Sequence, residues 1–323
     1  MAIDTLSAGL LIHAPRAGVR PSQALSHDRV IVFEADGRRT MTSAKATAPA
    51  ARPAVPPYLL PRSYIDPRWG YDLVQEPDQR WRIVAKRAER PGMLLAFPEA
   101  KLTDGDNRVR ITNTTVWPWT VQGHMIMTFP DGSQYIGSGT MLYRHHVLTA
   151  GHCVYSASNG GWASSVQFNA AQNDGTLPFG SAWATLLASF NGWVSSGLRD
   201  WDMGILVLNE DLGNSTGWMG IISTSDGNLM NHQITVAGYP GDKGGQQLWA
   251  STNPIVGVLA QLVSYNAYTK GGDSGAAAYG LWQGVDLEHQ AADHVAGPDG
   301  IPNTGCRVSA DKFQPIVDFI NSH

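Results

Sequence analysis

The sequence predicts an all-β protein that is rich in turns. Charged residues make up only 15% of the 323 positions and glycine accounts for 35 of them, a composition common in β-rich proteins whose surfaces are carried by uncharged polar residues. From about residue 105 onward, short apolar runs are separated by Gly, Asn, Asp and Ser at intervals of 8–15 residues, which is typical of a sandwich or barrel. The length allows two modest cores or one large core.

The clearest strand pair is a hairpin over residues 123–142. Its apolar runs, 124–129 and 134–142, flank the turn Pro130-Asp131-Gly132. The remaining strands are expected, in chain order, at 164–170, 182–190, 203–208, 219–223, 234–239, 255–264, 275–279, 285–290 and 306–309. Helical spacing at the C-terminus, with Pro315 near its start, predicts a helix over about 311–321.

Residues 1–101 are expected to be an N-terminal segment distinct from a domain at 102–323. Within it, residues 46–62 contain five prolines and no periodicity, which favours an extended, solvated connector. The runs Arg29–Glu34 and Trp81–Lys86 are candidate strands on either side of this connector. No compact fold is expected on either side, and part of the segment is predicted to be disordered.

The net charge of −4 hides an asymmetry between these two parts. Residues 1–101 hold 15 Lys and Arg against 10 Asp and Glu, whereas residues 102–323 hold 8 against 17. A basic segment is attracted to an acidic domain. The segment is therefore either an inhibitory or chaperoning partner of the domain, or a disordered basic tail.

Several classes of protein and site are not indicated by the sequence. No run approaches the ~20 apolar residues of a membrane span, and Leu10-Leu11-Ile12 is too short for the core of a signal peptide. No cofactor fingerprint, nucleic-acid patch or phosphate loop is present, and His145 and His146 lack Cys, Asp or Glu at metal-ligand spacing. Two further residues, Cys153 and Cys306, permit one disulfide or two buried thiols.

Two short motifs indicate a nucleophilic serine and its base. Ser274 lies in the run Gly272-Asp273-Ser274-Gly275, and His152 lies in Thr149-Ala150-Gly151-His152-Cys153. A serine hydroxyl becomes a useful nucleophile when an imidazole takes its proton, and an acid must hold that imidazole in one tautomer. Asp202, which leads into the apolar run 203–208, is the expected acid, and Asp200 is the fallback.

The order of the three residues points to a fold. His152, Asp202 and Ser274 follow the order histidine, aspartate, serine, which belongs to the chymotrypsin-like double β-barrel and not to the subtilisin or α/β-hydrolase arrangements. The backbone N–H groups of Gly272 and Ser274 are expected to form the oxyanion hole, since glycine brings its amide close to the reacting atom.

The region from about 102 to 323 resembles the glutamyl endopeptidases, a branch of the chymotrypsin-like serine proteases. The resemblance is carried by residues 107–115, by the histidine motif 149–155 and most specifically by residues 236–243, Val-Ala-Gly-Tyr-Pro-Gly-Asp-Lys. It implies two perpendicular six-stranded barrels, at about 105–212 and 215–310, with the active site in the cleft between them. It also implies a secreted enzyme that acts on proteins or peptides, and we expect a monomer without a cofactor.

In that family, a hydroxyl residue five positions before the nucleophile and a histidine in the pocket wall bind the P1 glutamate of the substrate. The positions that match are Thr269 and His289, with His294 as the rival histidine. A hydroxyl and an imidazole N–H supply hydrogen bonds to a carboxylate without a permanent cation. Each bond to a charged group contributes about 1.5–3 kcal/mol.

The sequence departs from the family pattern in two places. Asp273 stands where the glutamyl branch usually has Asn or Gln, which suggests that a freed amino terminus pairs with its carboxylate, as in trypsin-like zymogens. Gly137 stands where the usual disulfide partner of Cys153 would be. The resemblance further implies a removable prosegment that ends near Ala100-Lys101, cut after Lys101 by a trypsin-like activator or after Glu99 by the enzyme itself.

Three functional hypotheses remain open. The first is a serine endopeptidase that cleaves after Glu and is made as a zymogen. The second is a trypsin-like protease of other or broad specificity, and the third is a binding protein that keeps the barrels without catalysis.

Overall fold

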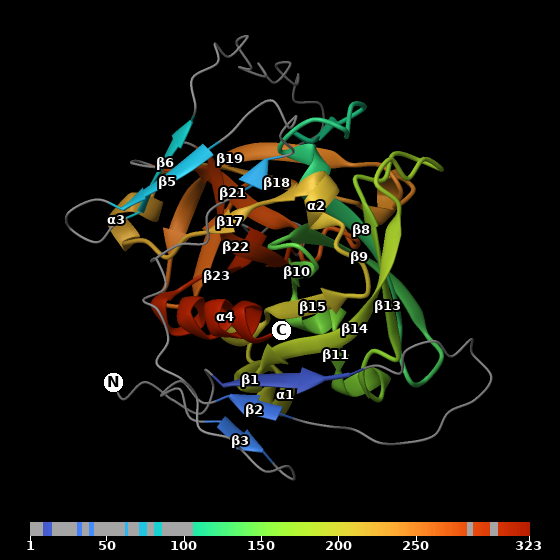
Figure 1. Cartoon of the computed structure of the whole chain (residues 1–323). Helices are drawn as coiled ribbons and strands as arrows, with labels where there is room; N and C mark the ends of the chain where they lie inside the picture. The colour runs from blue at the N-terminus through green and yellow to red at the C-terminus, as the bar shows by residue number, and fades with distance from the viewer. Residues whose placement is uncertain are drawn as a thin grey trace.

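A computed structural model of the chain contains two closed β-barrels and a C-terminal helix (Figure 1). The structure describes residues 9–14, 106–282, 287–297 and 303–323 in full, together with the backbone of five short strands in the N-terminal segment. The expected double six-stranded barrel is confirmed.

The first barrel consists of six antiparallel strands that close on themselves. Their order is β13-β8-β9-β10-β15-β14, and pairing of β13 with β14 completes the ring. The strands are β8 (Gln122–Thr128), β9 (Gln134–Met141), β10 (His146–Thr149), β13 (Ser165–Ala170), β14 (Ser181–Phe190) and β15 (Gly204–Leu208). The predicted hairpin is β8 and β9, in which Thr128 pairs with Gln134 across the turn.

The second barrel has the same number of strands, in the order β22-β21-β18-β19-β20-β23, and closes by pairing β22 with β23. The strands are β18 (Gln233–Gly238), β19 (Trp249–Val258), β20 (Leu262–Tyr265), β21 (Ala277–Leu281), β22 (Glu288–Ala296) and β23 (Asn303–Arg307). Two short strands attach outside the ring: β17 (Gly220–Ile221), parallel to β22, and β7 (Val109–Arg110), antiparallel to β19.

The C-terminal helix α4 (Ala310–Ser322) lies alongside the two barrels, at the place where they adjoin (Figure 1). Its apolar residues Phe313, Ile316, Phe319 and Ile320 recur at three- and four-residue spacing and are all buried, so one stripe of the helix faces the core. The helix begins at Ala310, three residues before the periodic run. Ser309 precedes it in an extended conformation, and its carbonyl accepts the N–H groups of Lys312 and Phe313.

Short helices and strands connect the barrel strands. The helices are α1 (Asn191–Ser196), α2 (Gly213–Thr216), α3 (Asp226–Leu229) and the 3₁₀ turns η1 (Trp119–Val121), η2 (Gly151–Cys153), η3 (Ala157–Asn159), η4 (Arg199–Trp201) and η5 (Gly241–Lys243). The short strands are β11 (Tyr155–Ser156), β12 (Gly161–Trp162) and β16 (Gly217–Trp218).

Strands of the N-terminal segment extend the sheet of the first barrel and form part of two separate two-stranded sheets. The sheet of the first barrel continues through β1 (Leu10–His13), β2 (Ile31–Phe33) and β3 (Arg39–Met41), and β4 (Arg62–Ser63) pairs with β16. The strands β5 (Tyr71–Gln75) and β6 (Trp81–Ala85) form a separate hairpin. The Pro-rich connector 46–62 lies outside the described residues except for Arg62.

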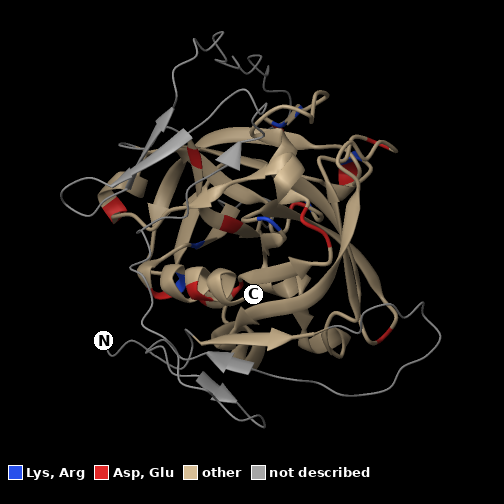
Figure 2. Cartoon of the chain, viewed as in Figure 1, with Lys and Arg blue, Asp and Glu red and all other residues tan. Residues whose placement is uncertain are grey.

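Several strand predictions differ from the structure: β10 was not expected, and the strand expected at 306–309 is found at 303–307. The run 255–264 is divided between β19 and β20 by a turn at Leu259–Gln261, and the strand predicted at 285–290 is found at 288–296. The shift of β22 matters for the site, because Asp293 and His294 are polar residues inside a buried strand. Charged residues are sparse along the described barrels (Figure 2). No helix in the described part of the chain has the length and apolar character needed to cross a membrane.

Candidate active site

Two neighbouring strands of the first barrel bring His152 and Asp202 together. Thr149, the last residue of β10, pairs with Gly204, the first residue of β15. Because the strands are antiparallel, the residues just after Thr149 and just before Gly204 meet at the same end of the barrel. His152 lies in the turn η2 there, and Asp202 follows the turn η4.

The carboxylate of Asp202 accepts two hydrogen bonds from His152. The backbone N–H donates to Oδ1 at 2.8 Å and Nδ1 lies 2.9 Å from Oδ2. Burial is the largest single influence on His152 and disfavours its charged form, but the charge and the hydrogen bond of Asp202, together with the neighbouring Cys153, raise the pKa of His152 well above its usual range. Asp202 thus stabilises the protonated form of the imidazole, and Nε2 is directed away from the carboxylate.

Ser274 belongs to the second barrel but is fastened to the first. Its carbonyl accepts a hydrogen bond from the backbone N–H of Ser138 on β9 at 2.8 Å and lies 3.7 Å from Cys153 Sγ. The next residue, Gly275, has φ of +83°, and a Cβ there would collide with the hydroxyl of Thr149. Only glycine therefore permits the serine loop to lie against the strand that ends beside His152.

Ser274 and His152 both lie in the described part of the chain, and no hydrogen bond joins Ser274 Oγ to His152 there. Such bonds are often long in the absence of substrate and tighten when it binds. The structure brings the two segments together, since the Ser274 carbonyl lies 3.7 Å from the Sγ atom of Cys153, the neighbour of His152.

The amides expected to form the oxyanion hole are unoccupied by other groups. Neither the Gly272 N–H nor the Ser274 N–H donates a hydrogen bond to any residue in the described part of the chain, and Gly272 is buried. The φ of Gly272 is +104°, a conformation that glycine adopts at low cost. A pair of preorganised, unshared donors next to a serine is suited to stabilising a developing negative charge.

Ser138 is a site residue that the sequence analysis missed. Its buried hydroxyl donates to the Gly272 carbonyl at 2.8 Å and accepts the Tyr239 N–H at 2.9 Å. One side chain of the first barrel thereby holds two backbone segments of the second. No sequence motif marks this role, since a serine in a strand carries no signal of what it faces.

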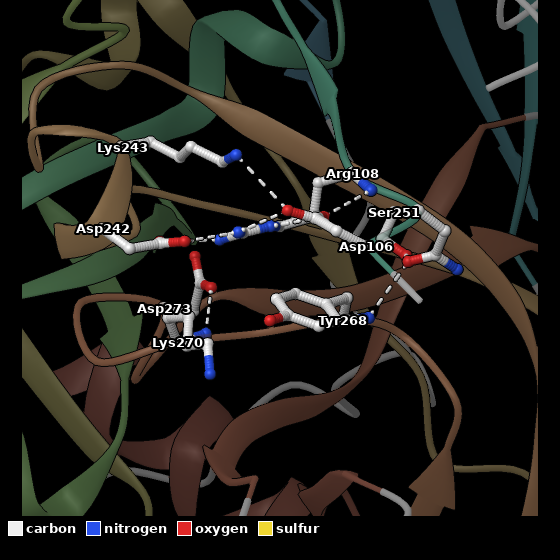
Figure 3. Close-up of polar contacts among 9 residues, drawn as sticks. Asp106, Arg108, Asp242, Lys243, Ser251, Tyr268, Lys270 and Asp273 are labelled. Atoms are coloured by element: carbon white, nitrogen blue, oxygen red, sulfur yellow. Dashed lines mark hydrogen bonds and ion pairs between the residues drawn. The ribbon is translucent and has the colours of Figure 1, made fainter. Parts of the chain in front are cut away.

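Asp273, the residue before the nucleophile, is buried close to a cluster of charges (Figure 3). One carboxylate oxygen accepts the Lys270 N–H at 2.9 Å. Burial raises the pKa of Asp273 to about 7. Arg108 lies nearby, but its guanidinium bonds to the carboxylates of Asp106 and Asp242 at 2.8 and 2.6 Å. The described residues provide Asp273 with no ion-pair partner.

The expected substrate pocket is only partly assembled from the predicted residues. Thr269 lies beside Gly297, whose hypothetical Cβ would be 2.7 Å from the threonine hydroxyl, and Asn303 borders the same glycine. His294 lies beside the two residues that follow Ser274, because its carbonyl accepts the Gly275 N–H and its N–H donates to the Ala276 carbonyl.

His289 does not lie where the sequence analysis expected it. It pairs with Gly280 and Gly220 at the other end of β22, five residues from His294 and therefore about 16 Å away along the strand. The expectation failed because the strand extends to residue 296, so that the rival His294 occupies the position beside Gly275.

The two cysteines are buried, unbridged thiols. Cys306 Sγ donates to the Asp200 carbonyl at 3.3 Å, and burial raises the pKa of Cys306 to about 12. Asp200, the fallback acid, lies in the turn before Asp202, and Asp202 alone of the two contacts His152.

Several known proteins are similar to this chain in sequence or in fold. The trypsin family model matches residues 108–279. A Bacillus subtilis protein described as an extracellular metalloprotease is 31% identical over 217 residues, which cover 67% of this chain and 68% of that protein. A glutamyl endopeptidase of Bacillus licheniformis is 29% identical over 231 residues, with 67% and 68% covered. A solved Glu endopeptidase superposes with a TM-score of 0.59 at 28% identity, over 68% of this chain and 98% of that chain.

The name of the Bacillus subtilis relative raises the question of a metal. Within the residues described, no group of three or more His, Cys, Asp or Glu side chains is arranged to hold a metal ion. Beside the serine loop the structure instead joins one histidine to one carboxylate, through the hydrogen bond between His152 and Asp202.

Proposed function

Because the chain belongs to the trypsin family and is a serine endopeptidase, we propose that His152, Asp202 and Ser274 form its catalytic triad and that it cleaves peptide bonds after glutamate. The observation that carries the triad is the pair of hydrogen bonds from His152 to Asp202, next to a serine loop with two unshared amides.

In the proposed mechanism, His152 Nε2 takes the proton of Ser274 Oγ as the oxygen attacks the substrate carbonyl, and it later donates that proton to the leaving amine. Asp202 keeps the Nδ1 proton in place and stabilises the imidazolium. The N–H groups of Gly272 and Ser274 bind the oxyanion, each contributing about 3 kcal/mol to transition-state stabilisation.

The proposed preference for glutamate rests on Thr269 and His294. Burial and the charge of His152 lower the pKa of His294 to about 3, so its imidazole is neutral at pH 7. The Tyr265 hydroxyl lies 2.9 Å from His294 Nδ1, and burial raises the pKa of Tyr265 well above its usual range, which keeps the hydroxyl protonated. If the hydroxyl donates to Nδ1, the imidazole proton resides on Nε2 and is available to a carboxylate.

The specificity proposal is tested by comparing three single variants on matched peptides with Glu or Phe before the scissile bond. Thr269→Val and His294→Leu should each lower kcat/KM for the Glu peptide by about 10–100-fold, since each removes one bond to a charged group, and should change the Phe peptide far less. His289→Leu is the matched control and should leave the ratio unchanged. Equal losses on both peptides for Thr269→Val and His294→Leu would refute the pocket.

The enzyme is further proposed to be made as an inactive precursor. The uncut chain leaves Asp273 buried without an ion-pair partner within the described residues, while Asp106 and Arg108 lie in the same cluster. A new amino terminus at Leu102 would be four residues from Asp106, a span of at most about 14 Å. Asp273 lies in the same charge cluster as Asp106, and the proposal is that this terminus pairs with the Asp273 carboxylate. Acetylating that terminus should abolish the activation.

The setting of the activity is proposed from the relatives. The Bacillus subtilis relative is described as extracellular, which supports action outside the cell on protein or peptide substrates. We propose a monomeric protease domain whose own N-terminal segment is its first partner.

A further inference from the structure

A strand from the beginning of the chain is built into the wall of the first barrel. The start of β14, residues 181–183, pairs with β13, and its end, residues 187–190, pairs with β1. The register sets Leu10 opposite Phe190 and His13 opposite Leu187, and Asn191 donates its N–H to the Gly9 carbonyl at 2.6 Å. The end of β14 thus has a strand partner that lies more than 170 residues away in sequence.

The contact is apolar on both faces of the added strand. Leu10, Leu11 and Ile12 are 0%, 8% and 2% exposed, and neighbouring side chains of a strand point to opposite faces. Leu10 and Ile12 belong to the apolar core of the first barrel. The ring of His13 stacks on Trp162, with centroids 5.4 Å apart and planes 6° from parallel. A disordered tail would leave these groups in water.

We propose that residues 9–14 are a strand-addition ligand of the end of β14, and that they stay bound there after the chain is cut between residue 14 and the protease domain. The cut enzyme is then a noncovalent complex of the protease domain with its own N-terminal peptide. The backbone pairing supplies affinity that does not depend on side chains. Each fully buried leucine or isoleucine side chain favours the bound state by roughly a further 10–100-fold.

The added strand also supports the segment that carries Asp202. Phe190, which pairs with Leu10, precedes α1, and its ring lies 5.6 Å from Trp201, the neighbour of Asp202. Trp193 of α1 packs edge-on against His152, with centroids 6.1 Å apart. Loss of β1 would therefore loosen the wall behind two members of the proposed triad.

The test uses the full chain with Ser274→Ala, which prevents self-cleavage, and with the recognition sequence of an unrelated site-specific protease inserted within residues 46–62. After the cut, size-exclusion chromatography with mass spectrometry should find both fragments in one peak at 1:1 stoichiometry. The double variant Leu10→Asp, Ile12→Asp should lose the N-terminal fragment, with affinity at least about 100-fold weaker. Leu259→Asp, at a residue 64% exposed on the second barrel, is the control and should retain it.

Separation of the two fragments in the parent protein would overturn the proposal, as would equal retention by the double variant. If the double variant does not fold, a fluorescent peptide of residues 8–15 is exchanged into the cut parent complex instead. Uptake of this peptide, but not of the same peptide with both Asp substitutions, supports the strand site. Equal signals from the two peptides refute it. Because Ser274→Ala is used throughout, the outcome is independent of the catalytic proposal.

Discussion

Replacing Asp202 by Asn tests the proposed triad at its most constrained point. The carboxylate accepts one hydrogen bond from the His152 backbone N–H at 2.8 Å and one from Nδ1 at 2.9 Å. The backbone group can only donate, so the asparagine must turn its carbonyl oxygen to it and its NH₂ group to Nδ1. Nδ1 must then accept, which puts the imidazole proton on Nε2, where it blocks the transfer from Ser274.

We expect Asp202→Asn to keep the fold and lower kcat/KM by about 10⁴, or roughly 5.5 kcal/mol of transition-state stabilisation. The assay is steady-state hydrolysis of a Glu peptide by the cut enzyme, with Ser274→Ala, about 10⁶ below the parent, as the floor. Asp200→Asn is the matched control and should stay within about threefold, since Asp200 does not contact His152. Activity of Asp202→Asn above one tenth of the parent, with a normal melting curve, would refute the assignment.

Three other buried polar side chains, Ser138, Asp273 and Lys312, give predictions that can be measured. Ser138→Ala should lower kcat by about 10–100-fold at nearly unchanged KM, because it frees the loop that aims the Gly272 amide; a change in KM alone would contradict this role. In uncut Ser274→Ala protein, the pKa of Asp273 is higher in the folded state than in the unfolded state. The protonated Asp273 side chain therefore stabilises the fold fully below about pH 4, and this stabilisation is lost as the pH rises to about 7. Across this pH range the free energy of unfolding, measured with urea, should fall by up to roughly 4 kcal/mol when Asp273 is present, and Asp273→Asn should abolish this fall. Parallel pH curves for the two proteins would rule this out. Lys312→Met should lower the free energy of unfolding by about 2 kcal/mol, since the buried ammonium bonds to the Arg307 carbonyl at 3.1 Å and lies 4.9 Å from the Trp201 ring; an unchanged melting temperature would contradict it.

Local motifs explain why the fold and the proposed triad could be predicted. Gly272 and Gly275 are required where the chain has positive φ and no room for a side chain, and the turn Pro130-Asp131-Gly132 carries its own conformational preference. Such requirements are written in a few adjacent residues, so a single sequence reveals them.

The features that were missed depend on partners distant in sequence. His294 follows the buried Asp293 and Gln290 in β22, and this polar stretch ends the apolar alternation that marks a strand, so the pattern favours His289. The run Leu10-Leu11-Ile12 is too short to indicate a signal peptide, and it carries no turn or partner strand beside it in the sequence. Its burial depends on the edge of β14, and no property of the three residues themselves indicates that edge.

The identity of residue 273 links the active site to the proposed processing of the chain. An Asn or Gln in this buried position would need hydrogen bonds but no counter-charge, whereas a carboxylate there is costly to ionise without a cation. Arg108 does not supply one directly, because two carboxylates already share its guanidinium. In the uncut chain the acid is therefore driven toward its neutral form, which weakens its bond from the Lys270 N–H and with it the loop that presents Gly272. An amino group arriving from the newly cut end of the chain would reverse each of these effects. The departure from the usual glutamyl pattern is thus a physical reason to expect that activity depends on cleavage.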